Sequence, residues 1–168
     1  MTPSKTPSIA IGAVTYLVLS LVTSFLAASG GAMSTLGGLL ACLVAVVAPV
    51  IAVWHYTSTH NVTLLPGQGA GLGAAAAAIG AALSGVIGLG LQSTGLFPST
   101  EEVLDQQRRD LIADGMSPDE VDRIMSMAGG MADNPVLGLA IGVVGGLVAG
   151  AFAGAIASLI FKKGEPEM

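Results

Sequence analysis

Residues 136–161 have the sequence VLGLAIGVVGGLVAGAFAGAIASLIF, which contains no charged side chain. About 20 such residues in a helix cross the ~30 Å hydrocarbon core of a bilayer. Glycine recurs at every fourth position of this stretch, at Gly138, Gly142, Gly146, Gly150 and Gly154. Residues four apart share one face of a helix, so the stretch predicts a membrane-spanning helix that carries a stripe of glycines.

Three earlier stretches have the same apolar character: 9–28, 36–56 and 69–91. Charged residues make up 10% of the chain, against about 25% in an average soluble domain. The runs are continuously apolar and lack the alternation of a lipid-facing β-strand. We therefore predict an all-α integral membrane protein with four transmembrane helices, in which residues 1–168 form a single membrane domain.

The first stretch shares two features with a secretory signal. Lys5 precedes it, and it ends in small residues. Its apolar run is longer than the ~7 to 15 residues of a signal's apolar region. We expect a retained transmembrane helix.

The third stretch carries a second row of small residues with the same period, Gly69, Gly73, Ala77, Ala81 and Gly85, beside a shorter row of Gly80, Ser84 and Gly88. Helices in lipid associate through close backbone approach, which small residues at every fourth position permit. We expect the third and fourth spans to pack face to face. The stripes either satisfy each other within one subunit or join two subunits.

The segment between these spans, approximately 99–129, predicts an extramembrane insert of two amphipathic helices. Ser99-Thr100-Glu101-Glu102 has the spacing of a capping box, and Gly115 supplies a stop. Ser117-Pro118-Asp119-Glu120 then places a cap, a proline and a glutamate where a second helix begins. The insert is either a solvated connector or a partner-binding surface.

Positive charge near the span ends predicts the orientation. Lys5, Lys162 and Lys163 flank the terminal spans, so the positive-inside rule places both termini in the cytoplasm of a bacterial cell, with the chain in the cytoplasmic (inner) membrane. Trp54 and Tyr56 close the second span, where amphipathic rings anchor helices at the membrane interface.

The sequence offers little for catalysis. No Asp, Glu, Lys or Arg lies inside the four stretches, which argues against a proton-coupled transporter. The only histidines, His55 and His60, are too few to hold a metal. Ala82-Leu83-Ser84-Gly85 resembles the motif of intramembrane serine proteases but has no histidine base at its depth. We expect no enzyme and no cofactor, and the absence of a polybasic patch argues against nucleic acid.

Sulfur-containing residues raise one further hypothesis. Met125, Met127 and Met131 precede the fourth span, and thioethers are soft ligands that suit Cu(I). The alternative is that they are hydrophobic contacts. Cys42, the only cysteine, predicts a buried structural thiol.

Three passages together resemble a known family: 52–56 continuing to 70 (AVWHY to GQGA), 114–121 (DGMSPDEV) and 157–163 (ASLIFKK). The chain is similar to the bacterial four-helix membrane family called domain of unknown function 4199. The resemblance implies the length, the four spans, the acidic insert before the last span and the lysine-bearing tail. It implies no activity for any residue.

These observations favour a non-enzymatic structural or accessory subunit that packs through glycine-striped helices. Its expected partners are the lipid bilayer and either further copies of itself or a larger membrane complex, with the insert as the contact surface. The alternative is a small conduit or carrier for a neutral solute or ion, and a second alternative is methionine-based Cu(I) binding.

Overall fold

The computed structural model describes residues 3–28, 32–95, 99–132 and 134–166. The helices in this part are α1 (Thr6–Ala28), α2 (Ala32–His60), α3 (Pro66–Ser93), α4 (Thr100–Ala113), α5 (Pro118–Ala132) and α6 (Pro135–Ile160). The described residues contain no β-strand, only an isolated bridge between Thr63 and Pro166. The prediction of an all-helical fold is confirmed for these residues.

The long helices contain the predicted spans but do not share their bounds. α2 begins four residues before 36 and ends four residues after 56. An apolar window marks only the part of a helix matched to hydrocarbon, whereas helical hydrogen bonding continues into the flanking polar residues. α6 ends one residue before the predicted limit, because Phe161 is its C-cap.

Local sequence signals position the helix starts. Gln68 accepts a hydrogen bond from the backbone N–H of Leu65 at 2.9 Å, and Pro66 is the first residue of α3. Asn134 accepts one from the backbone N–H of Leu137 at 3.2 Å, before Pro135 opens α6. Proline lacks an N–H that the first helical turn would leave unpaired, so it fits these positions.

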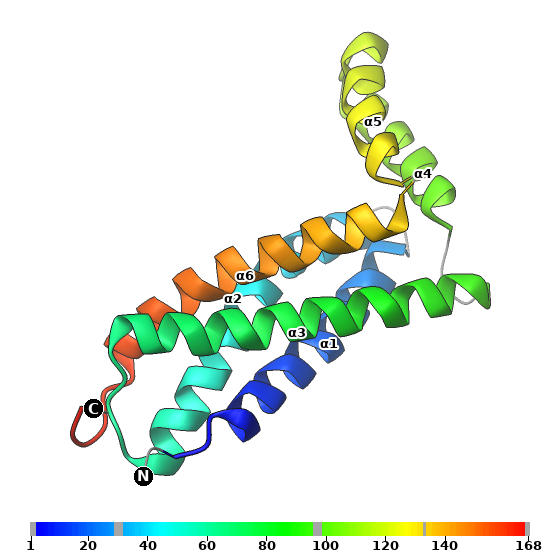
Figure 1. Cartoon of the computed structure of the whole chain (residues 1–168). Coiled ribbons are helices and arrows are strands. Elements are labelled where there is room, and N and C mark those ends of the chain that lie inside the picture. The colour runs from blue at the N-terminus through cyan, green and yellow to red at the C-terminus, as the bar shows by residue number, and fades with distance from the viewer. Residues whose placement is uncertain (1–2, 29–31, 96–98, 133, 167–168) are drawn as a thin grey trace.

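Four of the helices are long and apolar enough to cross a membrane, by length and composition: Thr6–Ala27, Leu39–His60, Pro66–Ser93 and Val136–Ile160. Figure 1 shows them side by side as a bundle, with α4 and α5 leading away from one end as a hairpin. Both termini and the α2–α3 connection lie at the opposite end. We call 6–16, 48–60, 66–80 and 146–160 the termini half, and 17–28, 32–47, 81–93 and 135–145 the hairpin half.

The buried core lies in the termini half and its adjoining loop, and is formed by Ala52, Val53, Tyr56, Leu64, Leu72, Ala76 and Ala157. Every described residue of α3 after Gly80, and of α6 before Gly146, is at least partly exposed. α1 and α2 keep some contact in the hairpin half, where Thr23 and Val44 are buried. The bundle is thus closed at one end and more open at the other.

Candidate functional site

The glycines of α3 and α6 face one another in the termini half. A Cβ atom added at Gly150 would lie 2.6 Å from both the carbonyl oxygen of Gly73 and the Cβ of Ala77. One added at Gly154 would collide with the carbonyl oxygen of Gly69. Real Cβ atoms essentially never approach within 3.0 Å of other heavy atoms, so these positions admit only glycine without a shift of the helices.

The same stripe opens toward the hairpin end. A Cβ at Gly146 would lie 3.3 Å from the carbonyl oxygen of Ala77, which is tighter than most real contacts but no collision, and one at Gly142 would meet nothing within 4 Å. Gly138 is exposed. Gly85 is covered by a leucine side chain of α6 rather than by a glycine. The ten small residues singled out from the sequence therefore divide into a closely packed group and an open group.

Three further glycines join α1 to its neighbours. A Cβ at Gly37 of α2 would lie 2.7 Å from the backbone nitrogen of Ala27 on α1. A Cβ at Gly12 would lie 2.8 Å from the Cβ atoms of both Ala52 and Ala76, where α1, α2 and α3 meet. A Cβ at Gly80 would lie 2.5 Å from that of Tyr16 on α1. In the sequence, Gly80 belongs to the shorter row of small residues on the third stretch, and Gly12 was not predicted as a contact. The available signal was that Gly12 is the only glycine in 9–28.

The two aromatic residues predicted as interface anchors differ in position. Trp54 is 49% exposed, whereas Tyr56 is fully buried. The Tyr56 hydroxyl donates to the carbonyl oxygen of Pro3 at 3.2 Å, and its ring lies 4.9 Å from that of His60 between centroids. Tyr56 is therefore a core residue that holds the N-terminal segment, because its side of α2 faces the bundle. Only Trp54 has the exposure that an anchor needs.

The histidines occupy separate environments. His55 shares a hydrogen bond of 2.9 Å between its Nδ1 and the hydroxyl of Ser8, which is 1% exposed. This bond ties α1 to α2, and His60 stacks obliquely on Tyr56 instead. Among the described residues, no group of three His, Cys, Asp or Glu side chains is placed to hold a metal.

The C-terminal tail folds back onto the α2–α3 connection. The backbone N–H of Thr63 donates to the carbonyl oxygen of Glu165 at 3.0 Å. The Thr63 hydroxyl donates to the carbonyl oxygen of Lys163 at 3.2 Å. Gly164 adopts φ +66°, a left-handed conformation that glycine tolerates. The tail thus closes the same end of the bundle to which Tyr56 holds the N-terminal segment.

The hairpin of α4 and α5 contains the predicted caps. Ser99 accepts from the backbone N–H of Glu102 at 3.2 Å, and the Glu102 carboxylate accepts from that of Ser99 at 2.7 Å. Ser117 donates from its hydroxyl to Glu120 at 2.8 Å and from its backbone at 3.2 Å, and these bonds hold the pKa of Glu120 below its ordinary value. Gly115, at φ +91°, separates the helices.

The two hairpin helices hold each other through an apolar and a charged contact. Val121 of α5 is fully buried, and the Arg108 guanidinium pairs with the Asp122 carboxylate across the hairpin. Both charged side chains are about half exposed, so this pair contributes little beside the apolar contact.

The structure places some of the sulfur-containing residues for which the sequence suggested a role. Met125 is half-buried on α5, while the side chains of Met127 and Met131 lie outside the described residues. Cys42 is exposed on α2, so the prediction of a buried thiol is wrong. A small apolar residue fits a lipid-facing position as readily as a core one, and the sequence does not distinguish the two faces.

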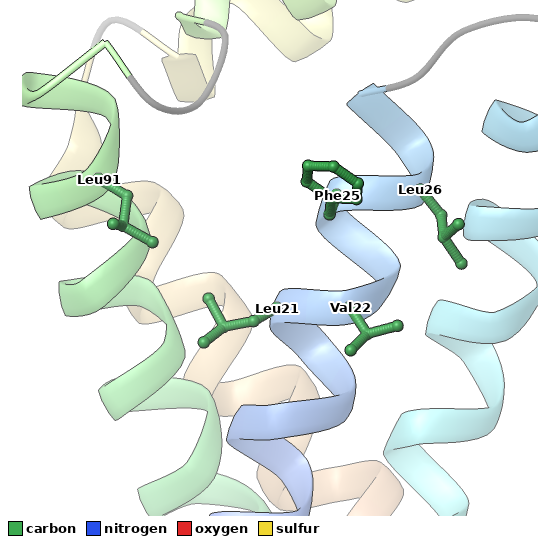
Figure 2. A pocket seen from close by; sticks show the side chains of 5 residues that line it. All are labelled: Leu21, Val22, Phe25, Leu26 and Leu91. Atoms are coloured by element: carbon green, nitrogen blue, oxygen red, sulfur yellow. The ribbon is translucent and has the colours of Figure 1, made fainter.

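An open apolar hollow of about 350 Å³ lies beside α1 and α3 in the hairpin half. It is lined by Leu21, Val22, Phe25, Leu26 and Leu91. Figure 2 shows the side chains of Leu21 and Leu91 pointing toward one another from the two helices. Its lining residues follow Tyr16 on α1 and Gly80 on α3 in the chain, so the hollow lies on the hairpin side of the close contact between those two residues.

Comparison with known proteins bears on the architecture. Residues 8–163 match the family model described as "Protein of unknown function (DUF4199)". The match confirms the resemblance inferred from the three sequence passages, and it extends from α1 to the tail. No curated protein and no solved structure matches the chain.

Proposed function

The chain belongs to the DUF4199 family, and from that premise and its own residues we propose that it is a structural or accessory subunit of the bacterial cytoplasmic (inner) membrane. In this proposal α1, α2, α3 and α6 span the bilayer, and α4 and α5 form an extramembrane contact surface. Both termini face the cytoplasm.

The observation that carries the proposal is the inverted placement of large and small residues. Within α6, Gly150, Gly154 and Ala157 are buried, whereas Phe152 is 70% exposed and Ile156 is 57% exposed. A water-soluble bundle places its large apolar side chains inside. Small residues inside and large ones outside suit a helix that packs closely against its neighbour and faces lipid with its remaining surface.

Charge placement supports the orientation. Lys5, Lys162 and Lys163 all lie at the termini end, whereas residues 99–126 hold eight acidic and three basic side chains. The positive-inside rule assigns the lysine-bearing end to the cytoplasm. The hairpin then faces the opposite side.

A non-enzymatic role fits the placement of the reactive side chains. Ser84, the serine of the protease-like motif, is on α3 in the hairpin half, while His55 is bonded to Ser8 in the termini half. A conduit along the bundle axis would have to pass Val53, Tyr56 and Leu64, which are all buried at the termini end. No observation favours that alternative.

The test is the mass of the particle extracted from native membranes into nanodiscs. The proposal expects an assembly heavier than the monomer, which Ile112→Glu and Ile124→Glu together dissociate, because both side chains are exposed on the hairpin. Lys162→Glu is the control, because it adds the same negative charge as the two hairpin substitutions together but is exposed at the opposite end of the bundle. A wild-type protein that is always monomeric would refute the accessory role.

A Gly142→Leu variant distinguishes the second route to assembly. If the open part of the glycine stripe joins two subunits, this variant dissociates the particle and the hairpin variants do not. The proposal expects the reverse result.

A further inference from the structure

We propose that the contact between α3 and α6 has a second, closed arrangement, in which α6 moves toward α3 until Gly142 packs against Ala81 as Gly150 packs against Gly73 in the structure. In the open arrangement described above, the side chain of Leu139 holds the two helices apart in the hairpin half. This inference rests on the proposed membrane insertion but goes beyond the accessory role, because it assigns the bundle a conformational change.

The register of the two small-residue stripes continues past the point where the close contact ends. The helices are antiparallel, so each four-residue step forward along α3 faces a four-residue step back along α6. Gly154 lies against Gly69, and Gly150 lies against Gly73. The same register pairs each further glycine of α6 with a small residue of α3: Gly146 with Ala77, Gly142 with Ala81 and Gly138 with Gly85. The sequence thus provides the residues for a close contact along the whole stripe.

The helices separate gradually along this register. A Cβ added at Gly150 would lie 2.6 Å from the carbonyl oxygen of Gly73. One added at Gly146 would lie 3.3 Å from the carbonyl oxygen of Ala77, and one at Gly142 would meet nothing within 4 Å. The contact therefore ends because the helices diverge, and no change in the pattern of small residues accompanies its end.

A flexible side chain occupies the place of the last contact of this register. A Cβ added at Gly85 would collide with the Cδ1 atom of Leu139. The end of a leucine side chain can move to another rotamer. The carbonyl oxygen of Gly73, which limits the approach at Gly150, is part of the backbone and cannot rotate aside. Leu139 thus separates the helices by a contact that a rotamer change can remove.

The open arrangement leaves groups of this half without the contacts that favour packing. The hydroxyl of Ser84, the residue before Gly85, is buried and has no hydrogen-bond partner among the described residues. A buried hydroxyl without a partner destabilises the arrangement that contains it. The exposed Gly142 likewise lacks the close backbone contact through which helices associate in lipid. Both features reduce the free-energy advantage of the open arrangement over the closed one.

The hairpin connects the two helix ends that closure brings together. α4 follows the end of α3 and α5 precedes the start of α6, and Figure 1 shows the hairpin leading away from this end of the bundle. Closure therefore changes the spacing between the two bases of the hairpin. A partner that binds one spacing more tightly shifts the bundle toward the corresponding arrangement.

Distances between spin labels test the closure in the full chain, by pulsed electron paramagnetic resonance in nanodiscs. Cys42→Ser removes the only native cysteine. Val86→Cys and Ile141→Cys place labels on α3 and α6 in the hairpin half. Ile79→Cys and Val148→Cys form the matched control pair in the termini half, about two helical turns away on each helix. All four native side chains are between 45% and 59% exposed, so the labels do not enter the contact between the helices.

Leu139→Ala should shorten the 86–141 distance by about 2 Å or more, the difference between tight and loose helix packing, and leave the 79–148 distance unchanged. Adding Gly142→Leu should restore the longer distance, because a leucine at this position cannot pack closely against Ala81. Val144→Ala is the control substitution, since Val144 is 58% exposed on the same helix, and it should change neither distance.

Four results would overturn the proposal, and they differ in meaning. An unchanged 86–141 distance in Leu139→Ala would show that this side chain does not hold the helices apart. Shortening at both pairs, or shortening that persists with Gly142→Leu, would indicate a general change of packing. Coupling between chains labelled at Val86 alone would show that a second copy lies against the open half. A chain that does not enter nanodiscs would contradict membrane insertion and so refute the proposed function as well.

Discussion

The termini half and the hairpin half contain similar amounts of glycine but pack differently. In the termini half, Gly150 and Gly154 of α6 meet Gly69 and Gly73 of α3 at distances that exclude a side chain. In the hairpin half, Gly142 meets nothing within 4 Å, although it belongs to the same stripe. A stripe of small residues therefore permits close approach without enforcing it along its whole length. Where two helices cross determines which of the glycines are used.

The largest expected difference between the two halves concerns leucine substitutions at two positions of the α6 glycine stripe. Gly150→Leu should abolish the folded bundle, because its neighbours include backbone atoms that cannot rotate away. Added bulk against mobile side chains typically costs only about 1 to 3 kcal/mol. Gly142→Leu should unfold at the same denaturant concentration as the wild type when both are titrated in mixed micelles. Equal loss at both positions would show that the open half also packs closely.

A second contrast lies within the termini half, between two aromatic residues of α2. Tyr56→Ala should cost about 3 to 5 kcal/mol, the typical cost of removing a buried aromatic ring. Trp54→Ala should cost much less, since Trp54 is half exposed. The same titration measures both variants. If Trp54→Ala proved the more damaging, the placement of Tyr56 in the core would be wrong.

The hairpin offers a test that should leave both halves of the bundle intact. Val121→Ala removes two methyl groups from the contact of α5 with α4 and should cost about 1 to 2 kcal/mol locally. Hydrogen exchange should rise in α4 and α5 but not in α3 or α6. Ile124→Ala is the control, because Ile124 is 40% exposed. A simultaneous rise in α6 would indicate that the hairpin and bundle unfold together.

The smallest effect concerns pH at the start of α5. Hydrogen bonds from the hydroxyl and then the backbone of Ser117 lower the pKa of Glu120 below its ordinary 4.5. The stabilisation is therefore fully present above pH 4.5 and is lost as the pH falls through the lower folded pKa. Hydrogen exchange at the first turn of α5 should increase over that range. Ser117→Ala should raise the Glu120 pKa toward 4.5, and an unchanged pKa would contradict this role.

The sequence predicted the features that depend on short-range pattern. The four apolar stretches correspond to long helices, and the cap at Ser99 uses the predicted hydrogen bonds. These features follow from composition and from residues three or four positions apart. They need no knowledge of the neighbouring helices.

The features that depend on helix orientation were less predictable. The pattern that marks an aromatic residue at the end of a span is the same whether its ring faces lipid or core. Tyr56 faces inward while Trp54, two residues earlier, faces outward. Likewise, the close contact at Gly12 depends on Ala52 of α2 and Ala76 of α3, which are distant from it in the sequence.

The fold-back of the tail has a consequence for biosynthesis. Thr63 bonds to Lys163, which the ribosome adds 100 residues later. Until α6 is made, the face of α3 that carries Gly69 and Gly73 lacks the helix that packs against it. The contact of α3 with α6 can therefore form only after residues 146–160 have been synthesised, whereas α1, α2 and α3 can pack together earlier.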